Sequence, residues 1–301
     1  MKKIIIVLSV LSLVKLSNAQ TIEKFSIDSG GASATAAGIE ILYTIGEVVV
    51  QEFSSASISV SEGFINPTAL EIKIDPKIFL QGPYSTGVLN DGLRTSANLP
   101  TTSPYIDGLT CDESIFATTG SDAIVDWVWI EIRAVDMTTV IQSMSALIQS
   151  DGDVVSVNGL SSIVVDVPDG NYYFMISHRN HLGVITSNQI NLTKGNTTIL
   201  DLTISNALIL GGSNGIADMG DGNFALFSGD FNGDGQIQNS DKIAVQSVLG
   251  TNGFLNADID MNSQVQNIDI QNKLTPNIGK GQQFSKNVSS LKLFAKTKKN
   301  K

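Results

Sequence analysis

The chain has 301 residues, a formal net charge of −10 and 42% hydrophobic residues, which suits two modest domains or one large β domain with an appendage. This acidic balance argues against nucleic acid as the main partner, because phosphate backbones are bound by clustered lysine and arginine. Cys111 is the only cysteine, so an internal disulfide framework is excluded.

The first residues predict export. A start with two lysines precedes an apolar run from Ile4 to Val14, and small residues precede Gln20. This order is typical of a secretory signal peptide over residues 1–19. The apolar run is too short for a stable membrane anchor, and no later stretch is long enough to span a bilayer. Loss of the three lysines in this segment would bring the net charge to −13, and residues 20–275 alone carry −20. Such a surface suits cations or an extracellular medium.

Residues 20–75 predict a small N-terminal β unit that ends in a linker. Segments 38–53 and 56–66 are rich in β-branched residues and favour two strands, with a serine-rich connector between them. Proline then becomes frequent, as at Pro76 and Pro83, which fits a linker and the start of an edge strand.

Residues 76–206 predict an antiparallel β-sandwich. Short strand patterns recur with turn signals between them and no helical periodicity, at 123–134, 140–149, 154–157, 171–178, 183–192 and 197–205. Residues 207–228, which are rich in glycine, are interpreted as a connector. The predicted fold is therefore mainly β: the sandwich, the small N-terminal unit and a C-terminal module described below.

Trp127 and Trp129 are two residues apart on one predicted strand, so they share a face with Glu131 and Arg133. The opposite face is aliphatic and belongs in the core. The tryptophans could then lie outside as a flat platform that stacks on a sugar ring, or they could be covered by a neighbouring loop. Aromatic pairs more often serve packing, and both interpretations stay open here.

His178 and His181 are the only histidines, and they flank Arg179 and Asn180. A metal pair is conceivable, but no cysteine or third histidine lies nearby to complete a zinc site. The pattern favours a hydrogen-bonded turn in which Arg179 and Asn180 order a loop.

Two aspartate-rich loops, 28 residues apart, carry the most specific pattern in the chain. Calcium takes six to eight oxygens, and a loop that supplies them at positions 1, 3, 5, 7, 9 and 12, with glycine at 6, wraps the ion. In the first loop these positions are Asp230, Asn232, Asp234, the Gln236 carbonyl, Gln238 and Asp241, with Gly235 at the turn. In the second loop they are Asp258, Asp260, Asn262, the Gln264 carbonyl, Gln266 and Asp269.

The two loops differ at position 6. The second has Ser263 where glycine is wanted, and a left-handed serine costs about 1 kcal/mol. The sequence therefore predicts two calcium sites, of which the first is tighter. Loops that serve only as turns are the alternative, and two loops in register favour calcium. A helix is expected after each loop, and Ile237 at position 8 is expected to pair its backbone with a neighbouring loop.

Residues 229–278 resemble a type I dockerin, a secreted module of two calcium loops that are each followed by a helix. The resemblance implies a calcium-stabilised module and a cohesin-like protein partner. Cohesin-binding dockerins typically carry a serine–threonine pair at positions 10 and 11, where this chain has Asn239–Ser240 and Asn267–Ile268. The segment 279–301 is rich in lysine, and we expect it to be disordered.

A broader resemblance covers residues 30–206. Segments such as YTIGEVVV, DAIVDWVWIEIR and GNYYFMISHRNHLGVIT are similar to surface proteins exported by the type IX secretion system, some of them labelled haemagglutinin-like. This implies a secreted protein, or one on the outer cell surface of a Gram-negative bacterium.

For catalysis the sequence offers no nucleophile elbow, HExxH motif or phosphate loop, so we expect no enzyme. The favoured function is a non-enzymatic adhesin or scaffold whose partner is a cell-surface glycan or an extracellular protein. The alternatives are a docking module for a cohesin-like partner and a carbohydrate-binding accessory of a glycan-degrading system.

Overall fold

The computed structural model describes residues 30–36, 39–45, 53–55, 58–60 and 70–285. The chain divides into two compact units, Met1–Ala69 and Leu70–Lys301. The predicted signal peptide and residues 286–301 of the predicted tail lie outside the described residues.

The first unit contains two short antiparallel hairpins. In one, β1 (Gly30–Ala36) pairs with β2 (Ile39–Ile45). In the other, β3 (Phe53–Ser55) pairs with β4 (Ile58–Val60). The sequence predicts two longer strands here, and the structure divides the region more finely, because β-branched composition indicates strand without marking each turn.

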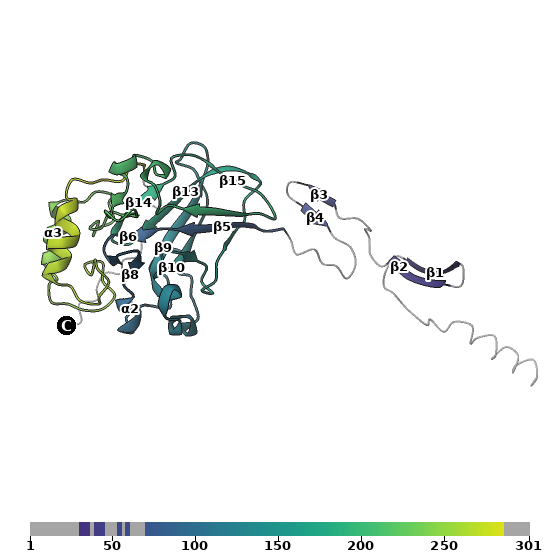
Figure 1. The fold of residues 1–301 in the computed structure, drawn as a ribbon, viewed down its shortest axis with the longest axis horizontal. Coiled ribbons are helices and arrows are strands. Elements are labelled where there is room, and N and C mark those ends of the chain that lie inside the picture. Colours follow the sequence, from purple (N-terminus) through teal and green to yellow (C-terminus); the bar gives the residue numbers. More distant parts are fainter. Residues whose placement is uncertain (1–29, 37–38, 46–52, 56–57, 61–69, 286–301) are drawn as a thin grey trace, which may run out of the picture. The chain divides into compact units, whose positions relative to one another are not determined.

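A six-stranded antiparallel sheet forms the centre of the second unit (Figure 1). Its strands follow the order β11–β10–β9–β13–β14, and β15 pairs with the first residues of β13. Their bounds are β9 Ile124–Arg133, β10 Val140–Gln149, β11 Val154–Val155, β13 Gly170–His178, β14 His181–Ile185 and β15 Ile190–Leu192. The prediction of a mainly β, antiparallel protein is confirmed at this level.

Three smaller sheets complete the described part of the second unit, with strand orders β12–β5–β16, β17–β18–β6 and β7–β8. Two of their pairings are parallel, β16 with β5 and β18 with β6, which the sequence does not predict. The bounds are β5 Ile72–Lys77, β6 Phe79–Leu80, β7 Tyr84–Ser85, β8 Val88–Leu89, β12 Ile163–Val165, β16 Thr197–Asp201, β17 Ala217–Asp218 and β18 Phe224–Leu226.

The helical segments are short. They are the α-helices α2 (Gly92–Thr95) and α3 (Asn239–Gln246), the π-helical segment η5 (Asp269–Leu274), and the 3-10 turns Glu113–Ala117, Gly120–Asp122, Asn206–Leu208, Gly212–Asn214 and Thr275–Asn277. Within the residues described, no helix combines the length and the apolar character needed to cross a membrane.

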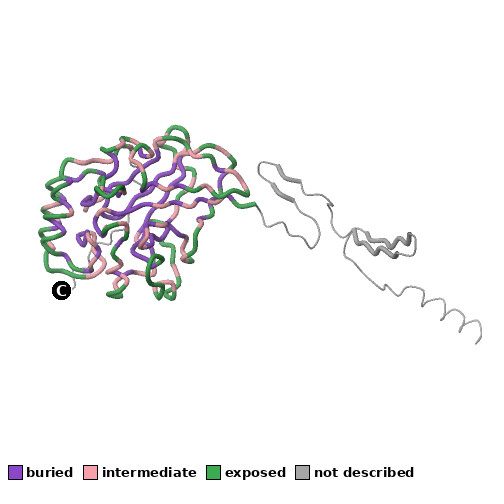
Figure 2. Tube along the Cα trace, viewed as in Figure 1, coloured by how far each residue is buried: buried purple, intermediate pink, exposed green. Residues whose placement is uncertain are grey.

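The main hydrophobic core joins the six-stranded sheet to β5, β12 and β16. All ten residues of β9 are buried, so both faces of the central strand are covered (Figure 2). A second cluster lies among the aspartate loops and contains Ile237, Val245, Ile259, Val265, Ile270 and Leu274. Leu182 of β14 and Phe227, next to β18, belong to the same cluster, so the loops pack directly on the β strands.

The aspartate loops consequently form one compact unit with the sheets. The expectation of a separate C-terminal module after a connector does not describe this arrangement. Residues 207–228, predicted as the connector, include β17 and β18, and β18 pairs with β6. Residues 279–285, predicted as part of a disordered tail, are described and bonded to the first loop, where the Gln282 N–H donates to the Gly235 carbonyl at 2.8 Å.

The interpretation of Trp127 and Trp129 as an exposed platform is wrong, because their side chains are buried at 0% and 2% exposure. The Trp127 indole N–H donates to the Pro100 carbonyl at 2.8 Å. The Tyr105 ring lies 5.7 Å from the Trp129 ring. The loop around residues 98–110 therefore covers this face of β9.

The polar residues on the same face of β9 are buried too. Glu131 accepts hydrogen bonds from the Trp129 indole at 2.9 Å and from Arg133 Nε at 2.7 Å. The Arg133 guanidinium also lies 4.9 Å from the Phe284 ring. Each buried charge is therefore paired, as burial of an ion requires.

We predict that Trp129→Ala lowers the free energy of unfolding by about 3–5 kcal/mol, the usual cost of truncating a buried aromatic side chain. Denaturant titration followed by circular dichroism measures this change. Ile199→Ala, at a position that is 77% exposed, is the control and should change the unfolding free energy by less than about 0.5 kcal/mol. An equally small effect of Trp129→Ala would contradict the structure.

Candidate metal centre

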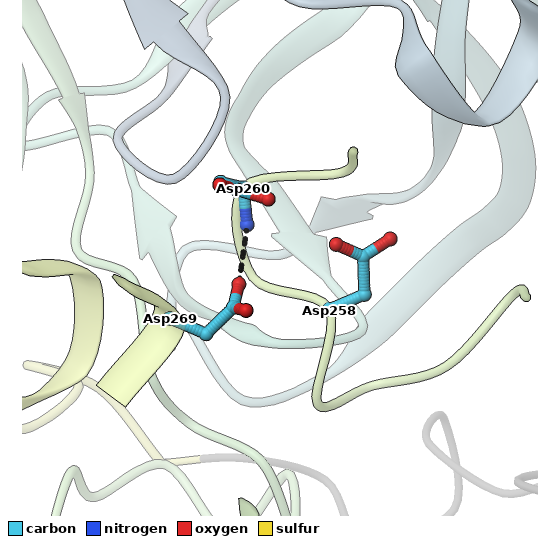
Figure 3. Close-up of side chains that lie close together, drawn as sticks. All are labelled: Asp258, Asp260 and Asp269. Carbon is cyan, nitrogen blue, oxygen red and sulfur yellow. Dashed lines mark hydrogen bonds between the residues drawn. The ribbon is translucent and has the colours of Figure 1, made fainter. Parts of the chain in front are cut away.

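Three carboxylates converge in the second aspartate loop. Asp258, Asp260 and Asp269 each offer one carboxylate oxygen, and these oxygens lie within 4.8 Å of one another. Figure 3 shows the group, in which the Asp260 N–H donates to Asp269 Oδ1 at 3.1 Å. Asp258 and Asp269 are buried and Asp260 is half-buried. This is the sole group of three or more acidic, histidine or cysteine ligands that meets so closely in the described ranges.

The same hydrogen bonds recur in both loops. At position 1, Asp230 and Asp258 each accept the N–H of the residue at position 6, at 3.1 Å from Gly235 and 2.9 Å from Ser263. At position 12, Asp241 and Asp269 each accept the N–H of the glutamine at position 9, at 2.9 and 2.8 Å. They also accept the N–H at position 3, at 3.2 and 3.1 Å. The repeat in the sequence is thus a repeat of backbone geometry.

The turn at position 6 has the conformation that the sequence predicts. Gly235 has a φ of +86° and Ser263 a φ of +73°, so the serine adopts the left-handed region that favours glycine. The Ser263 hydroxyl accepts a hydrogen bond from Asn98 Nδ2 at 2.9 Å, which supports this conformation.

The loops differ in where the third acid lies. The second loop carries it at position 3 (Asp260), which is half-buried and faces the other two carboxylates, whereas the first loop carries it at position 5 (Asp234), which is exposed. The first loop has the amide of Asn232 at position 3. The convergence of three carboxylates is therefore confined to the second loop.

The predicted ligands fall into three classes of burial. Asp230, Asp241, Asp258 and Asp269 are buried, Asp260 and Asn262 are half-buried, and Asn232, Asp234, Gln236, Gln238, Gln264 and Gln266 are exposed. The aspartates at positions 1 and 12 therefore form the interior of each loop, and the glutamines lie at its rim.

The residues at position 8 pair with segments that follow the helices. The Ile237 N–H donates to the Lys280 carbonyl at 2.9 Å, and the Val265 N–H donates to the Thr251 carbonyl at 2.8 Å. The predicted helix after the first loop is α3, in which Val245 is buried and Ile243 is exposed. After the second loop the chain forms the π-helical η5 and then a 3-10 turn at Pro276.

Burial raises the pKa values of all three carboxylates. Burial raises the pKa of Asp258 to about 7, the Asp269 carboxylate adds to the rise, and the Arg179 charge opposes it. Burial is also the main cause of the raised pKa of Asp260 and of Asp269, and for Asp260 the Asp269 charge contributes. A bound cation would remove this cost by neutralising the charge.

The donor set fits calcium. Calcium prefers carboxylate, amide and carbonyl oxygens and tolerates irregular geometry. The second loop offers three converging carboxylates, and the Asn262 amide and the Gln264 backbone carbonyl follow Asp260 in the same loop. No nitrogen or sulfur ligand lies in the group, which separates it from a zinc site.

Beside this loop lies a buried polar turn formed by His178, Arg179, Asn180 and His181, between β13 and β14. Asp126 of β9 accepts hydrogen bonds from Arg179 Nε at 2.9 Å and from His178 Nε2 at 3.1 Å. Burial alone would raise the Asp126 pKa, but Arg179 and His178 hold it below its ordinary value. The prediction of a hydrogen-bonded turn that orders a loop is confirmed.

The hydrogen bonds imply that both histidines are neutral. His178 Nε2 donates to Asp126, and its Nδ1 accepts the Asn180 N–H at 3.4 Å. His181 Nε2 accepts the Gly82 N–H at 3.0 Å, so its proton is on Nδ1, which donates to Asn180 Oδ1 at 2.7 Å. Burial lowers the pKa of His178, against the opposing effect of Asp126. Burial, followed by the charge that His178 would carry if it were protonated and by the Arg179 charge, lowers the pKa of His181 well below 6.5.

Comparisons with known proteins assign no family. No protein-family model matches the chain, and neither does any curated protein. Two similar solved structures are a C-terminal and an N-terminal interface mutant of a type II cohesin–X-dockerin complex from Acetivibrio cellulolyticus. Each match covers 69% of this chain and 96% of the other, at a TM-score of 0.36 and with 15% and 14% identity respectively. Likeness at this level is too distant to assign a fold or a partner.

We predict that, with calcium bound so that Asp258, Asp260 and Asp269 stay charged, the two histidines make the free energy of unfolding fall as the pH decreases below 6.5. Above that pH the histidines are neutral in both states. Below it the unfolded chain binds protons that the folded protein, with its lowered histidine pKa values, does not yet bind, so stability is lost as the pH falls. Denaturant titration at pH 8, 7, 6 and 5.5 in saturating calcium measures the slope.

His181→Gln provides the matched comparison, because glutamine does not titrate. Its slope below pH 6.5 should be shallower than that of the wild type, by at most about 1.4 kcal/mol per pH unit for one proton. Identical slopes for the two proteins would show that His181 binds its proton equally well in the folded and unfolded states.

Proposed function

We propose that this protein acts outside the cell as a non-enzymatic adhesin or scaffold whose aspartate loops bind calcium and thereby stabilise the β unit that carries them. The observation that carries the proposal is the convergence of Asp258, Asp260 and Asp269 in a loop whose hydrogen-bond frame is repeated 28 residues earlier. A cation is the simplest group that makes three adjacent buried or half-buried carboxylates favourable.

In this proposal each loop holds one calcium ion. The second ion is held by Asp258, Asp260, Asn262, the Gln264 carbonyl, Gln266 and Asp269, and the first by Asp230, Asn232, Asp234, the Gln236 carbonyl, Gln238 and Asp241. Calcium supplies positive charge to oxygens that otherwise repel one another. Its binding is therefore linked to the order of the loops and to the packing of the second hydrophobic cluster.

The structure favours the second site as the tighter one, the reverse of the order expected from Ser263. Affinity for calcium rises with the number of charged ligands, which is three aspartates in each proposed site, and with the rigidity of the site, which differs between them. Three carboxylates meet in the second loop, and the Asn98 hydrogen bond supports the left-handed serine. We therefore propose two unequal sites, of which the second fills first.

The extracellular location rests on the predicted signal peptide and on the acidic net charge. Of the two partner classes that the sequence allows, the glycan candidate depended on Trp127 and Trp129, which are buried. An extracellular protein is accordingly the partner class that we propose. With the tryptophans covered, the carbohydrate-binding alternative loses the residues on which it was based.

We predict that calcium raises the melting temperature and the free energy of unfolding, by about 2.7 kcal/mol at a concentration one hundred times the dissociation constant. Calorimetry should show two unequal sites. Asp258→Ala should remove the tighter one, Asp230→Ala should remove the weaker one, and Asp166→Ala, at an exposed acid, should remove neither. If the wild-type protein takes up no calcium at millimolar concentration, the loops are only turns.

A second candidate function, protein docking through the helix after the first loop, is favoured by the exposure of Ile243 on α3 at 65%. Bound protein should then depend on both calcium and this side chain. A pull-down from extracellular material should capture a partner with calcium, lose it with EGTA, and lose it with Ile243→Asp in calcium. Capture that is indifferent to Ile243→Asp would exclude this surface.

A further inference from the structure

The turn at His178–His181 is fully covered, although it is a hairpin connection. Arg179 and Asn180 are both 0% exposed. Connections between strands usually lie at the surface, because buried backbone groups need partners. Here the partners come from the segment that leads into the second aspartate loop, which lies over the turn.

Asn180 contacts the start of both aspartate loops. Its Nδ2 donates to the backbone carbonyls of Asn256 at 2.9 Å and Asp258 at 3.0 Å. Its own carbonyl accepts the N–H of Gly229, the residue before Asp230, at 2.9 Å. The side chain of Asn180 thus bonds to the second loop, and its backbone carbonyl bonds to the first.

The orientation of the Asn180 amide is determined by its neighbours. Its Oδ1 accepts the proton on His181 Nδ1, so its Nδ2 must face the loop. Arg179 extends the contact, because its guanidinium donates to the Leu255 carbonyl and lies 4.4 Å from the Phe254 ring. The residues just before Asp258 are therefore held by groups that belong to the β hairpin.

The far side of the second loop is held in the same manner. Asn98, which follows α2, donates from Nδ2 to the Ser263 hydroxyl at 2.9 Å. Between the two asparagines the backbones lie so close that a Cβ on Gly82 would be 1.9 Å from the Ile259 carbonyl oxygen, and one on Gly92 would be 2.5 Å from the Met261 carbonyl oxygen. The second loop is thus fixed against the β unit from Asn256 to Ser263.

We propose that Asn180 and Asn98 are positioning residues of the second calcium site, so that the site belongs to the β unit as much as to the loop. This rests on the proposed calcium binding. Three carboxylates that repel one another would move apart in a loop free to spread. Asn180 holds the start of the loop and Asn98 holds its turn at Ser263, so the segment that carries Asp258 and Asp260 stays where these carboxylates meet Asp269. Neither residue is proposed as a metal ligand, because their side-chain groups are bonded within the protein: Asn180 Nδ2 donates to two backbone carbonyls, Asn180 Oδ1 accepts from His181 Nδ1, and Asn98 Nδ2 donates to the Ser263 hydroxyl.

The test is a calcium titration by calorimetry in an Asp230→Ala background, which leaves the second site to be measured alone. In that background we expect Asn180→Ala to raise the calcium dissociation constant by about 10- to 100-fold, the usual effect of removing a group that orients metal ligands. Asn98→Ala should raise it by several-fold. Asn188→Ala, at an exposed asparagine between β14 and β15, should leave it unchanged.

The first site distinguishes positioning from general weakening. In an Asp258→Ala background, Asn180→Ala should leave the first-site dissociation constant within about threefold of its value, because the bond to Gly229 uses the backbone carbonyl that alanine retains. Near-UV circular dichroism at the titration temperature confirms that each variant is folded.

Each outcome decides the proposal. Equal loss at both sites, or no loss at the second site, overturns it. If Asn180→Ala does not fold, the half-buried Asn98→Ala decides alone, and an unchanged second-site constant overturns the proposal. A wild-type protein that binds no calcium would overturn the proposed function itself. A wild-type protein that binds two ions, together with asparagine variants that bind them equally well, would overturn only the positioning role of Asn180 and Asn98.

Discussion

The arrangement of this protein depends on the hydrogen bonds and the ion pair that a buried carboxylate on the central strand forms with the His178–His181 turn. Asp126 lies in β9, fully covered, and is satisfied by Arg179, by His178 and by the backbone N–H of Trp127 at 2.7 Å. Removal of one partner from a buried ion pair typically costs 3–5 kcal/mol, because the other charge is left without compensation. The sheet therefore fixes the position of the His178–His181 turn, and that turn is where the aspartate loops attach.

Charge is arranged in opposite ways on the two sides of this turn. On the sheet side each buried charge has its partner: Asp126 with Arg179, and Glu131 with Arg133. On the loop side three carboxylates face one another, with only the Arg179 charge to offset them at Asp258. The buried charges on the sheet side are thus balanced within the protein, whereas bound calcium would balance the carboxylates on the loop side. Arg179 lies between the two groups.

Much of the local structure could be predicted from sequence, because it depends on short-range patterns. Strands rich in β-branched and aromatic residues, such as β9 and β13, were found near their predicted positions. The left-handed turn at Ser263 followed from loop spacing alone, and the turn at Arg179 and Asn180 followed from residue types that hydrogen-bond locally.

What the sequence did not predict depends on contacts between distant segments. Alternation along β9 separates two faces, but it does not show that Pro100 and Tyr105 cover the tryptophans. The bonds from Asn180 to Asn256 and Asp258 join residues 76 and 78 positions apart, so the loops appeared to be a separate module. The parallel pairs β5–β16 and β6–β18 were missed for the same reason.

Amide hydrogen exchange with and without calcium tests most directly whether the loops and the sheet form one unit. The account predicts that chelation increases exchange in peptides covering 255–263 and, together with them, in peptides covering the 177–182 hairpin, because the two segments share their hydrogen bonds. If the loop peptides lost protection while the hairpin kept all of its own, the loops would be an independent module and the account would be contradicted.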